Sequence, residues 1–259
     1  MKKLFFYLLL IPGIFLVSCD EDEETPTSTG TQRYFALYFD VDRNSETNVL
    51  DIDANFWTSD LSEVPTVTIN GVSMENFGFE GGLYGNLNNL QYANTVNYSI
   101  SLDDKTTTGS IDMPSDPYNV LCNGISIEEG QNTIPIPQNN SFNISWLCNS
   151  YDYFYIYWSS YNNYSNDNIT VNNYTFYYDG LGYYYFSIYS YKGPILMSGS
   201  QPNVTGDYGK GYVFAESDGF NFDWYYYSSS IQKLSTNIVD DKARITYYKE
   251  KFNELISTK

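Results

Sequence analysis

Apolar and polar positions alternate along most of the chain from residue 33 onward. In the segment RYFALYFD, Phe35, Leu37 and Phe39 fall on one face of an expected strand. The segment VLDIDANFW gives a second inward-facing set: Leu50, Ile52, Ala54 and Phe56. This period of two is typical of β-strands with one buried face, so the pattern predicts a β-sheet protein.

Turn-forming residues separate these segments. Asn70-Gly71 interrupts TVTINGVSM and is the preferred dipeptide of a two-residue hairpin. The strand expected in TVNYSISL is followed by Asp103-Asp104 and a partner strand in TTGSIDM. Two prolines then follow within four residues, at Pro114 and Pro117. Proline cannot donate to a strand ladder, so we place a domain boundary there.

The second half repeats this organisation with more aromatic residues. SFNISW places Phe142, Ile144 and Trp146 on an inner face, and further tyrosine-rich strands follow at intervals of roughly 8–12 residues, which predicts a sandwich or barrel. The order F-x-I-S-W, turn, tyrosine-rich strand resembles fibronectin type III and related immunoglobulin-like domains. The resemblance implies an all-β fold of tandem immunoglobulin-like β-sandwiches, at residues 33–116 and 117–236.

The pattern changes in the last part of the chain. A spacing of three and four residues relates four apolar side chains there: Ile245, Tyr248, Phe252 and Leu255. This spacing predicts a short C-terminal amphipathic α-helix within 237–259, with Asp240 or Asp241 placed to cap its start. The alternative is a last strand followed by a tail.

The N-terminus has the features of an export signal. Lys2-Lys3 precede the apolar run LFFYLLLIPGIFLV, which is too short to span a bilayer and contains Pro12-Gly13. The end of this run and the two residues after it read Leu16-Val17-Ser18-Cys19, which resembles the lipobox of bacterial lipoproteins. That resemblance implies cleavage of residues 1–18 and attachment of diacylglycerol to Cys19. The alternative is an ordinary signal peptide with an incidental cysteine.

Five consecutive acidic residues, DEDEE, follow Cys19. Like charges repel and do not pack, so residues 19–32 are expected to be a disordered tether. An acidic run directly after the lipidated cysteine also resembles the signal that exports lipoproteins of the Bacteroidota to the outer face of the outer membrane. Inner-membrane retention, which an Asp after the cysteine directs in enteric bacteria, is the alternative. We expect an outward-facing, lipid-anchored outer-membrane protein.

Composition excludes several function classes. The 259-residue chain has a formal net charge of −18 and no basic stripe, so a nucleic-acid partner is excluded. It contains no histidine, which removes Ser-His-Asp and Cys-His nucleophile activation and imidazole-bound zinc. We expect no resident cofactor, with calcium as the one exception.

Two cysteines remain once Cys19 is assigned to lipidation. Cys122 and Cys148 are an even pair in a chain expected to reach an oxidising compartment, so a disulfide between them is predicted. Two buried free thiols are the alternative.

The segment DVDRNSETNVLD resembles the calcium loop of an EF-hand or dockerin repeat. Six oxygen-bearing residues occupy the ligand positions: Asp40, Asp42, Asn44, Glu46, Asn48 and Asp51. The segment has Ser45 where such loops carry glycine, and strands are expected on both sides of it. A polar hairpin loop is therefore the favoured interpretation, and calcium binding is the alternative.

The tyrosine-rich strands are the strongest candidate for a ligand site. Tyrosine and tryptophan rings stack on the C–H faces of sugars, and neighbouring amides and carboxylates bind the hydroxyl groups. In the run Tyr153–Trp158 both faces are apolar or aromatic, so one face contacts a partner or lies under loops or the terminal helix. The candidate binding residues are Trp158, Tyr161, Tyr164 and Trp224. The alternative is that these rings only build the core.

These observations favour a non-catalytic binding role, with glycan capture as its leading form, as in the outer-membrane lipoproteins of starch-utilisation systems. An adhesion or envelope-structural protein that recognises another surface protein is the alternative. A glycoside-active enzyme would need two carboxylates about 5–10 Å apart in a cleft. Glu216 and Asp223 are an example of such a candidate pair, but no motif selects them.

Overall fold

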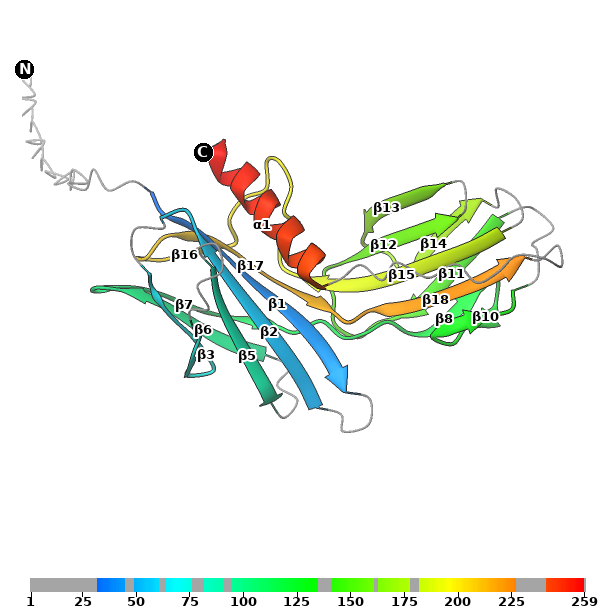
Figure 1. The fold of residues 1–259 in the computed structure, drawn as a ribbon, viewed down its shortest axis with the longest axis horizontal. Coiled ribbons are helices and arrows are strands. Elements are labelled where there is room, and N and C mark those ends of the chain that lie inside the picture. Colours follow the sequence, from blue (N-terminus) through cyan, green and yellow to red (C-terminus); the bar gives the residue numbers. More distant parts are fainter. Residues whose placement is uncertain are drawn as a thin grey trace, which may run out of the picture. The chain divides into compact units, whose positions relative to one another are not determined.

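Three β-sheets and one helix make up the described part of the chain (Figure 1). The structure is a computed structural model that describes residues 32–44, 49–60, 64–75, 82–90, 95–134, 141–160, 163–177, 182–226 and 241–258. The expected signal peptide, Cys19 and the acidic run lie outside these residues. Residues Gln32–Lys259 form one compact unit.

The largest sheet has ten strands in the described residues. They are β1 (Tyr34–Asn44), β2 (Val49–Thr58), β5 (Gly82–Leu90), β10 (Gly130–Asn132), β12 (Tyr153–Ser160), β13 (Tyr164–Ile169), β15 (Gly182–Lys192), β16 (Val204–Thr205), β17 (Lys210–Ser217) and β18 (Phe220–Tyr226). Most pairs are antiparallel, but β1 pairs with β17 in parallel, and β10 pairs with β18 in parallel. The sheet therefore joins strands from both sides of Pro114 and Pro117.

Two smaller sheets have four strands each. One contains β3 (Thr66–Ile69), β4 (Val72–Ser73), β6 (Thr95–Leu102) and β7 (Lys105–Asp112). The other contains β8 (Tyr118–Cys122), β9 (Ile125–Ser126), β11 (Ser141–Leu147) and β14 (Asn173–Tyr177). The Asn70-Gly71 turn joins β3 to β4 with positive φ at both residues, as the type I′ geometry requires.

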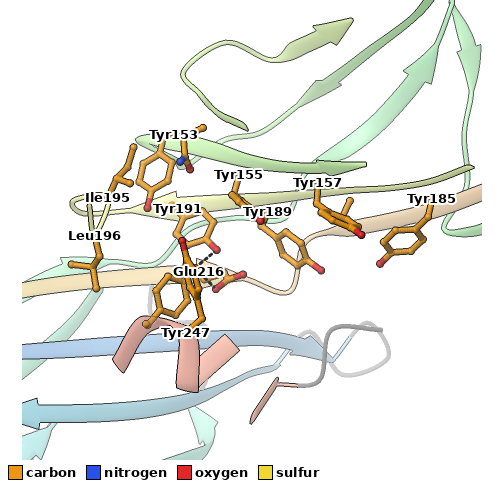
Figure 2. Close-up of a pocket in the computed structure, with 13 residues that line it drawn as sticks. Tyr153, Tyr155, Tyr157, Tyr185, Tyr189, Tyr191, Ile195, Leu196, Glu216 and Tyr247 are labelled. Carbon is orange, nitrogen blue, oxygen red and sulfur yellow. Dashed lines mark hydrogen bonds between the residues drawn. The ribbon is translucent and has the colours of Figure 1, made fainter. Parts of the chain in front are cut away.

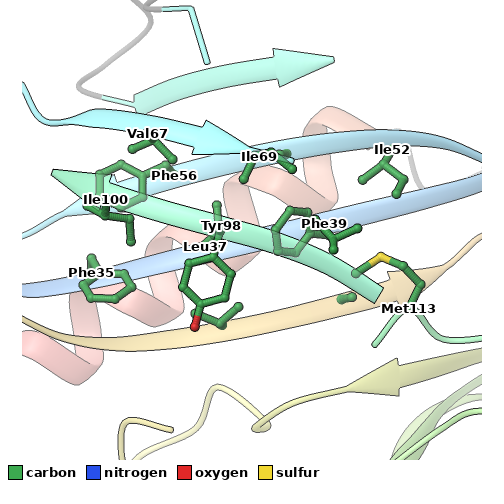
Figure 3. Close-up of a cluster of buried hydrophobic side chains, with 14 of the residues drawn as sticks. Phe35, Leu37, Phe39, Ile52, Phe56, Val67, Ile69, Tyr98, Ile100 and Met113 are labelled. Atoms are coloured by element: carbon green, nitrogen blue, oxygen red, sulfur yellow. The ribbon is translucent and has the colours of Figure 1, made fainter. Parts of the chain in front are cut away.

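The first core lies between the ten-stranded sheet and the β3–β4–β6–β7 sheet (Figure 3). Phe35, Leu37 and Phe39 of β1 point into it, and Ile52, Ala54 and Phe56 of β2 do the same. The opposite sheet contributes Val67, Val96, Tyr98 and Ile100. The predicted alternation in this half is therefore confirmed.

Close packing in this core also requires glycine at position 211. Gly211 of β17 lies opposite Phe35 in the parallel pairing, and a Cβ at position 211 would be 2.1 Å from the Phe35 ring. Any side chain there would displace the ring.

The second core lies between the β8–β9–β11–β14 sheet and the other end of the ten-stranded sheet. Phe142, Ile144 and Trp146 point into it as predicted, and Phe154, Ile156, Phe186 and Ile188 meet them from β12 and β15. Each small sheet thus covers one part of the same face of a continuous larger sheet.

The predicted C-terminal helix is confirmed as α1 (Asp241–Ser257), which begins at one of the two expected capping positions. It packs on the opposite face of β1 and β17 from the first core (Figure 1). Phe252 and Leu255 are buried against Ala36, Tyr38, Tyr212 and Phe214. The outer face of β1 and β17 carries apolar side chains, and α1 covers them.

The predicted disulfide is not formed, since Cys122 and Cys148 are both free thiols. Cys122 lies opposite Ile144 in the pairing of β8 with β11. Cys148 follows four residues further along the chain from Ile144, which is about 13 Å of extended strand. The Cys148 thiol instead donates to the backbone oxygen of Ser115, at 3.1 Å. The alternation placed both cysteines at strand ends but did not determine the register between the strands.

Among the described residues, no helix has the length and apolar character needed to cross a membrane.

Candidate ligand-binding site

A pocket of about 240 Å³ opens on the outer face of β12 and β15, opposite the second core (Figure 2). Eight of its thirteen lining residues are tyrosines: Tyr153, Tyr155 and Tyr157 of β12, Tyr185, Tyr189 and Tyr191 of β15, and Tyr247 and Tyr248 of α1. Asn168, Ser187, Ile195, Leu196 and Glu216 complete the lining. We call this set the tyrosine pocket.

Strand periodicity explains why so many tyrosines gather here. Phe154, Ile156 and Trp158 point into the core, so the alternate residues of β12 must point outward. The same holds on β15, where Phe186 and Ile188 are core residues. The sequence predicted that one face of Tyr153–Trp158 contacts a partner or lies under loops or the terminal helix. In the structure this is the outer tyrosine face of β12, and α1 lies beside part of it.

The register brings the tyrosines together across the two strands. Tyr153 lies opposite Tyr191, with parallel rings whose centroids are 4.8 Å apart. Tyr155 lies opposite Tyr189, and Tyr157 is diagonal to Tyr185, with centroids 6.4 Å and 6.1 Å apart. The result is a run of tyrosine pairs that follows the direction of the strands.

Amide groups flank the tyrosine pairs on both sides. Asn168 of β13 lies opposite Tyr155. On the other side, Asn221 of β18 accepts hydrogen bonds at Oδ1 from the phenols of Tyr185 and Tyr189, at 3.0 and 3.3 Å. Asn221 thereby fixes the orientation of two rings of the pocket.

A glycine makes room for one of these rings. Gly219 lies at the break between β17 and β18, which pair in succession with β15; its φ is +83°, and a Cβ there would lie 2.6 Å from Cδ1 of Tyr189. The left-handed backbone at this break and the position of the Tyr189 ring therefore depend on the same residue.

The one carboxylate among the described lining residues is Glu216, which is 1% exposed. Its Oε2 atom accepts hydrogen bonds from the phenols of Tyr38, at 2.8 Å, and Tyr248, at 3.2 Å. The phenols of Tyr248 and Tyr191 also share a hydrogen bond. This network connects α1 to the floor of the pocket.

Burial favours the neutral form of five of the pocket's phenols. Burial raises the pKa of Tyr191 and Tyr248 well above the usual value of 10, and the nearby Glu216 carboxylate raises both further. Burial also raises the pKa of Tyr153, Tyr155 and Tyr185. These groups are hydrogen-bond donors and acceptors at neutral pH, and none of them is a general base there.

The structure places three of the four candidate binding residues elsewhere. Trp224 is fully buried in the second core, and Trp158 is half-buried and stacks on Phe176 with centroids 4.9 Å apart. Tyr164 of β13 is 77% exposed, and Tyr161 lies outside the described residues. Trp158, Tyr164 and Trp224 are not in the lining of the tyrosine pocket.

The candidate calcium ligands lie partly on strands. Asp40 and Asp42 belong to β1, and Asp51 of β2 lies directly opposite Asp42. The chain is therefore extended from the first to the third ligand position, where a calcium loop turns tightly. The side chain of Asn44, together with Glu46 and Asn48, lies outside what the structure describes. In the described residues, no group of three or more acidic or cysteine side chains is placed to hold a metal ion.

Glu216 and Asp223 do not form a glycosidase pair. Glu216 lies opposite Tyr191 and Asp223 opposite Tyr185, so six residues of β15 separate them. That distance is about 20 Å along a strand, whereas paired catalytic carboxylates lie about 5–10 Å apart.

Comparisons with known proteins add no family to this description. A scan against protein-family models finds no match, and a search of curated proteins finds no similar sequence.

Proposed function

We propose that this protein is a lipid-anchored, outward-facing outer-membrane protein that captures a glycan without catalysing a reaction. The lipobox-like sequence at Cys19 and the acidic run behind it support the location. One observation carries the ligand class, namely the set of eight tyrosines in a single pocket flanked by Asn168 and Asn221.

The chemistry of the pocket suits a sugar ring. Half-buried tyrosines such as Tyr155 and Tyr189 offer flat apolar faces for the C–H faces of a pyranose. Their phenols, the Asn168 amide and the Ser187 hydroxyl offer both donors and acceptors to sugar hydroxyls. A site with an apolar lining and a few polar groups is the usual composition of small-ligand pockets.

Two alternatives receive less support from this geometry. A protein partner needs about 800 Å² of surface on each side, whereas the tyrosines line a small concave pocket. A glycoside-active enzyme needs a carboxylate pair, and the candidate pair is about 20 Å apart along β15. We therefore place a capture function ahead of adhesion and catalysis.

The finer fold interpretation also belongs to this proposal. We interpret the two cores as two immunoglobulin-like sandwiches that share the ten-stranded sheet. Support comes from the packing of one four-stranded sheet over each core.

A glycan array with the full-length protein purified in detergent tests the ligand class. Retention of one group of neutral glycans is the expected result. No binding to any glycan on an array of neutral, acidic and amino sugars would contradict glycan capture.

A further inference from the structure

The two ends of the tyrosine pocket differ in how deeply their tyrosines are buried. At one end, Tyr153 and Tyr191 are only 7% and 2% exposed. Toward the start of β15, two and six residues before Tyr191, Tyr189 and Tyr185 are half-buried, as are Tyr155 and Tyr157 on β12. The pocket therefore becomes more open along the strand direction from Tyr191 toward Tyr185.

Side chains from three other elements close the buried end. Glu216 comes from β17, Tyr247 and Tyr248 from α1, and Ile195 with Leu196 from the segment after β15. Figure 2 shows Leu196, Glu216 and Tyr247 near Tyr191, with Tyr157 and Tyr185 at the opposite end of the group. Leu196 is 6% exposed and packs with Phe252 and Leu255, so the helix and this segment form one wall.

That wall is held in place by more than apolar contact. Tyr248 packs against Tyr38 and Phe214, with centroids 4.9 and 5.2 Å apart, and its phenol donates to Glu216. A ligand that approaches from the open end cannot continue past this wall without displacing α1 from β1 and β17.

At the open end, tyrosines continue along β15 beyond the pocket. Tyr183 is half-buried and donates a hydrogen bond to Oδ2 of Asp223 at 3.2 Å. It precedes Tyr185 by two residues, about 6.6 Å along the strand, on the same outer face. Among the described residues, the lining contributed by α1 and by Ile195–Leu196 lies at the other end of the pocket.

We propose that the tyrosine pocket receives the terminal residues of a linear, neutral glycan, whose chain leaves the pocket along β15 toward Tyr185 and Tyr183. The inference rests on the glycan-capture function proposed above. The volume of about 240 Å³ is below the roughly 300–1,000 Å³ of sites for drug-sized ligands, so it suits the end of the chain and not a long internal segment. The blind end then selects for chain ends, because an internal segment would need an exit on both sides.

Binding stoichiometry distinguishes recognition of ends from recognition of internal segments. The full-length protein, purified in detergent, is titrated by calorimetry with maltohexaose, cellohexaose, mannohexaose and laminarihexaose. The linkage that binds is then titrated as longer chains of defined length. We expect one protein bound per chain at every length, with the same dissociation constant within about threefold.

Two tyrosine variants assign the binding to this pocket. Tyr155→Ala removes a half-buried ring of the pocket, and we expect at least a tenfold weaker affinity. Tyr177→Ala is the matched control, because Tyr177 is 72% exposed on β14 in another sheet. An unchanged affinity in Tyr155→Ala would overturn the assignment.

The remaining outcomes separate the two proposals. Several proteins bound per chain, with a number that rises with chain length, would overturn end recognition and leave glycan capture intact. If the protein binds none of the four hexaoses and no glycan on the array, glycan capture and the inference are both overturned.

Discussion

The phenol of Tyr248 on α1 donates a hydrogen bond to the buried carboxylate of Glu216 on β17, with 3.2 Å between the two oxygen atoms. Residues 32 positions apart in the chain thereby join the C-terminal helix to the floor of the tyrosine pocket. Glu216 also accepts from Tyr38 beneath the helix, so one carboxylate serves both the stability of the fold and the shape of the pocket.

The buried network predicts a large cost for removing the carboxylate. In Glu216→Ala, the phenols of Tyr38 and Tyr248 lose their acceptor inside the protein, and we expect the free energy of unfolding to fall by about 2–4 kcal/mol. Urea denaturation followed by tyrosine and tryptophan fluorescence measures this. Glu254→Ala is the control, because its ion pair with Lys251 is exposed and should contribute less than about 1 kcal/mol. Equal effects of the two substitutions would contradict the role of Glu216.

Two adjacent tyrosines of α1 offer a sharper comparison. Tyr248→Phe deletes the hydroxyl that donates to Glu216, and we expect it to lower the free energy of unfolding by about 1–2 kcal/mol. Tyr247→Phe should change it by less than about 0.5 kcal/mol, because Tyr247 is 51% exposed. A larger effect for Tyr247 would mean that α1 is rotated on the sheet.

Hydrophobic periodicity was sufficient to predict both cores and the helix: a period of two for the strands, and a spacing of three and four residues for α1. The described side chains of the inward sets around Phe35, Ile52 and Ile144 are all buried, and the side chain of Leu50 lies outside the described residues. Burial on one side leaves a period of two in any strand. The pairing partners could not be predicted in this way. The parallel contact of β1 with β17, which connects residues about 176 positions apart, leaves no local signal.

The candidate site illustrates the same limit. The sequence showed that Tyr153–Trp158 carries aromatic or aliphatic residues on both faces, but not which set faces outward. Trp158 and Trp224 were predicted to bind a ligand because tryptophan rings stack on sugars, but both pack in the second core. The outward set could be recognised from β12 and β15 together, since each has tyrosine alternating with Phe and Ile. The contribution of Tyr247 and Tyr248 depends on tertiary packing that the sequence does not display.

The raised tyrosine pKa values predict a loss of stability in alkali. The folded protein keeps protons on Tyr191 and Tyr248 above pH 10, whereas the unfolded chain releases them near pH 10. Because the folded state then binds more protons, the free energy of unfolding should fall as the pH rises through 10 and above. Absorbance at 295 nm should show tyrosines that ionise only on unfolding. Smooth titration of all 28 tyrosines near pH 10 in the folded protein would contradict this.

The free cysteines predict a specific alkylation pattern. The chain should take up iodoacetamide at both Cys122 and Cys148 after unfolding without a reductant, as peptide mass spectrometry would show. In the folded protein Cys122 should be protected, because it is fully buried and burial raises the pKa of its thiol to about 12. A peptide pair linked through these two residues would contradict the free-thiol structure.

The proposed membrane anchor has its own test. In cells of a bacterium that processes lipoproteins, the wild-type protein should incorporate labelled palmitate and remain with the membrane fraction. Cys19→Ala should lose the label, because no acceptor thiol remains in the lipobox-like sequence. Label retained in Cys19→Ala would place the lipid elsewhere, and no label in the wild-type protein would indicate an ordinary signal peptide.

The affinity of the full-length protein for the neutral glycan that it retains on the array, compared with that of Tyr189→Ala, tests the central claim most directly. Tyr189 is a half-buried ring of the tyrosine pocket that Asn221 orients, so its loss should weaken binding at least tenfold, or about 1.4 kcal/mol. Unchanged binding in Tyr189→Ala, with folding verified by circular dichroism, would contradict glycan capture at this site.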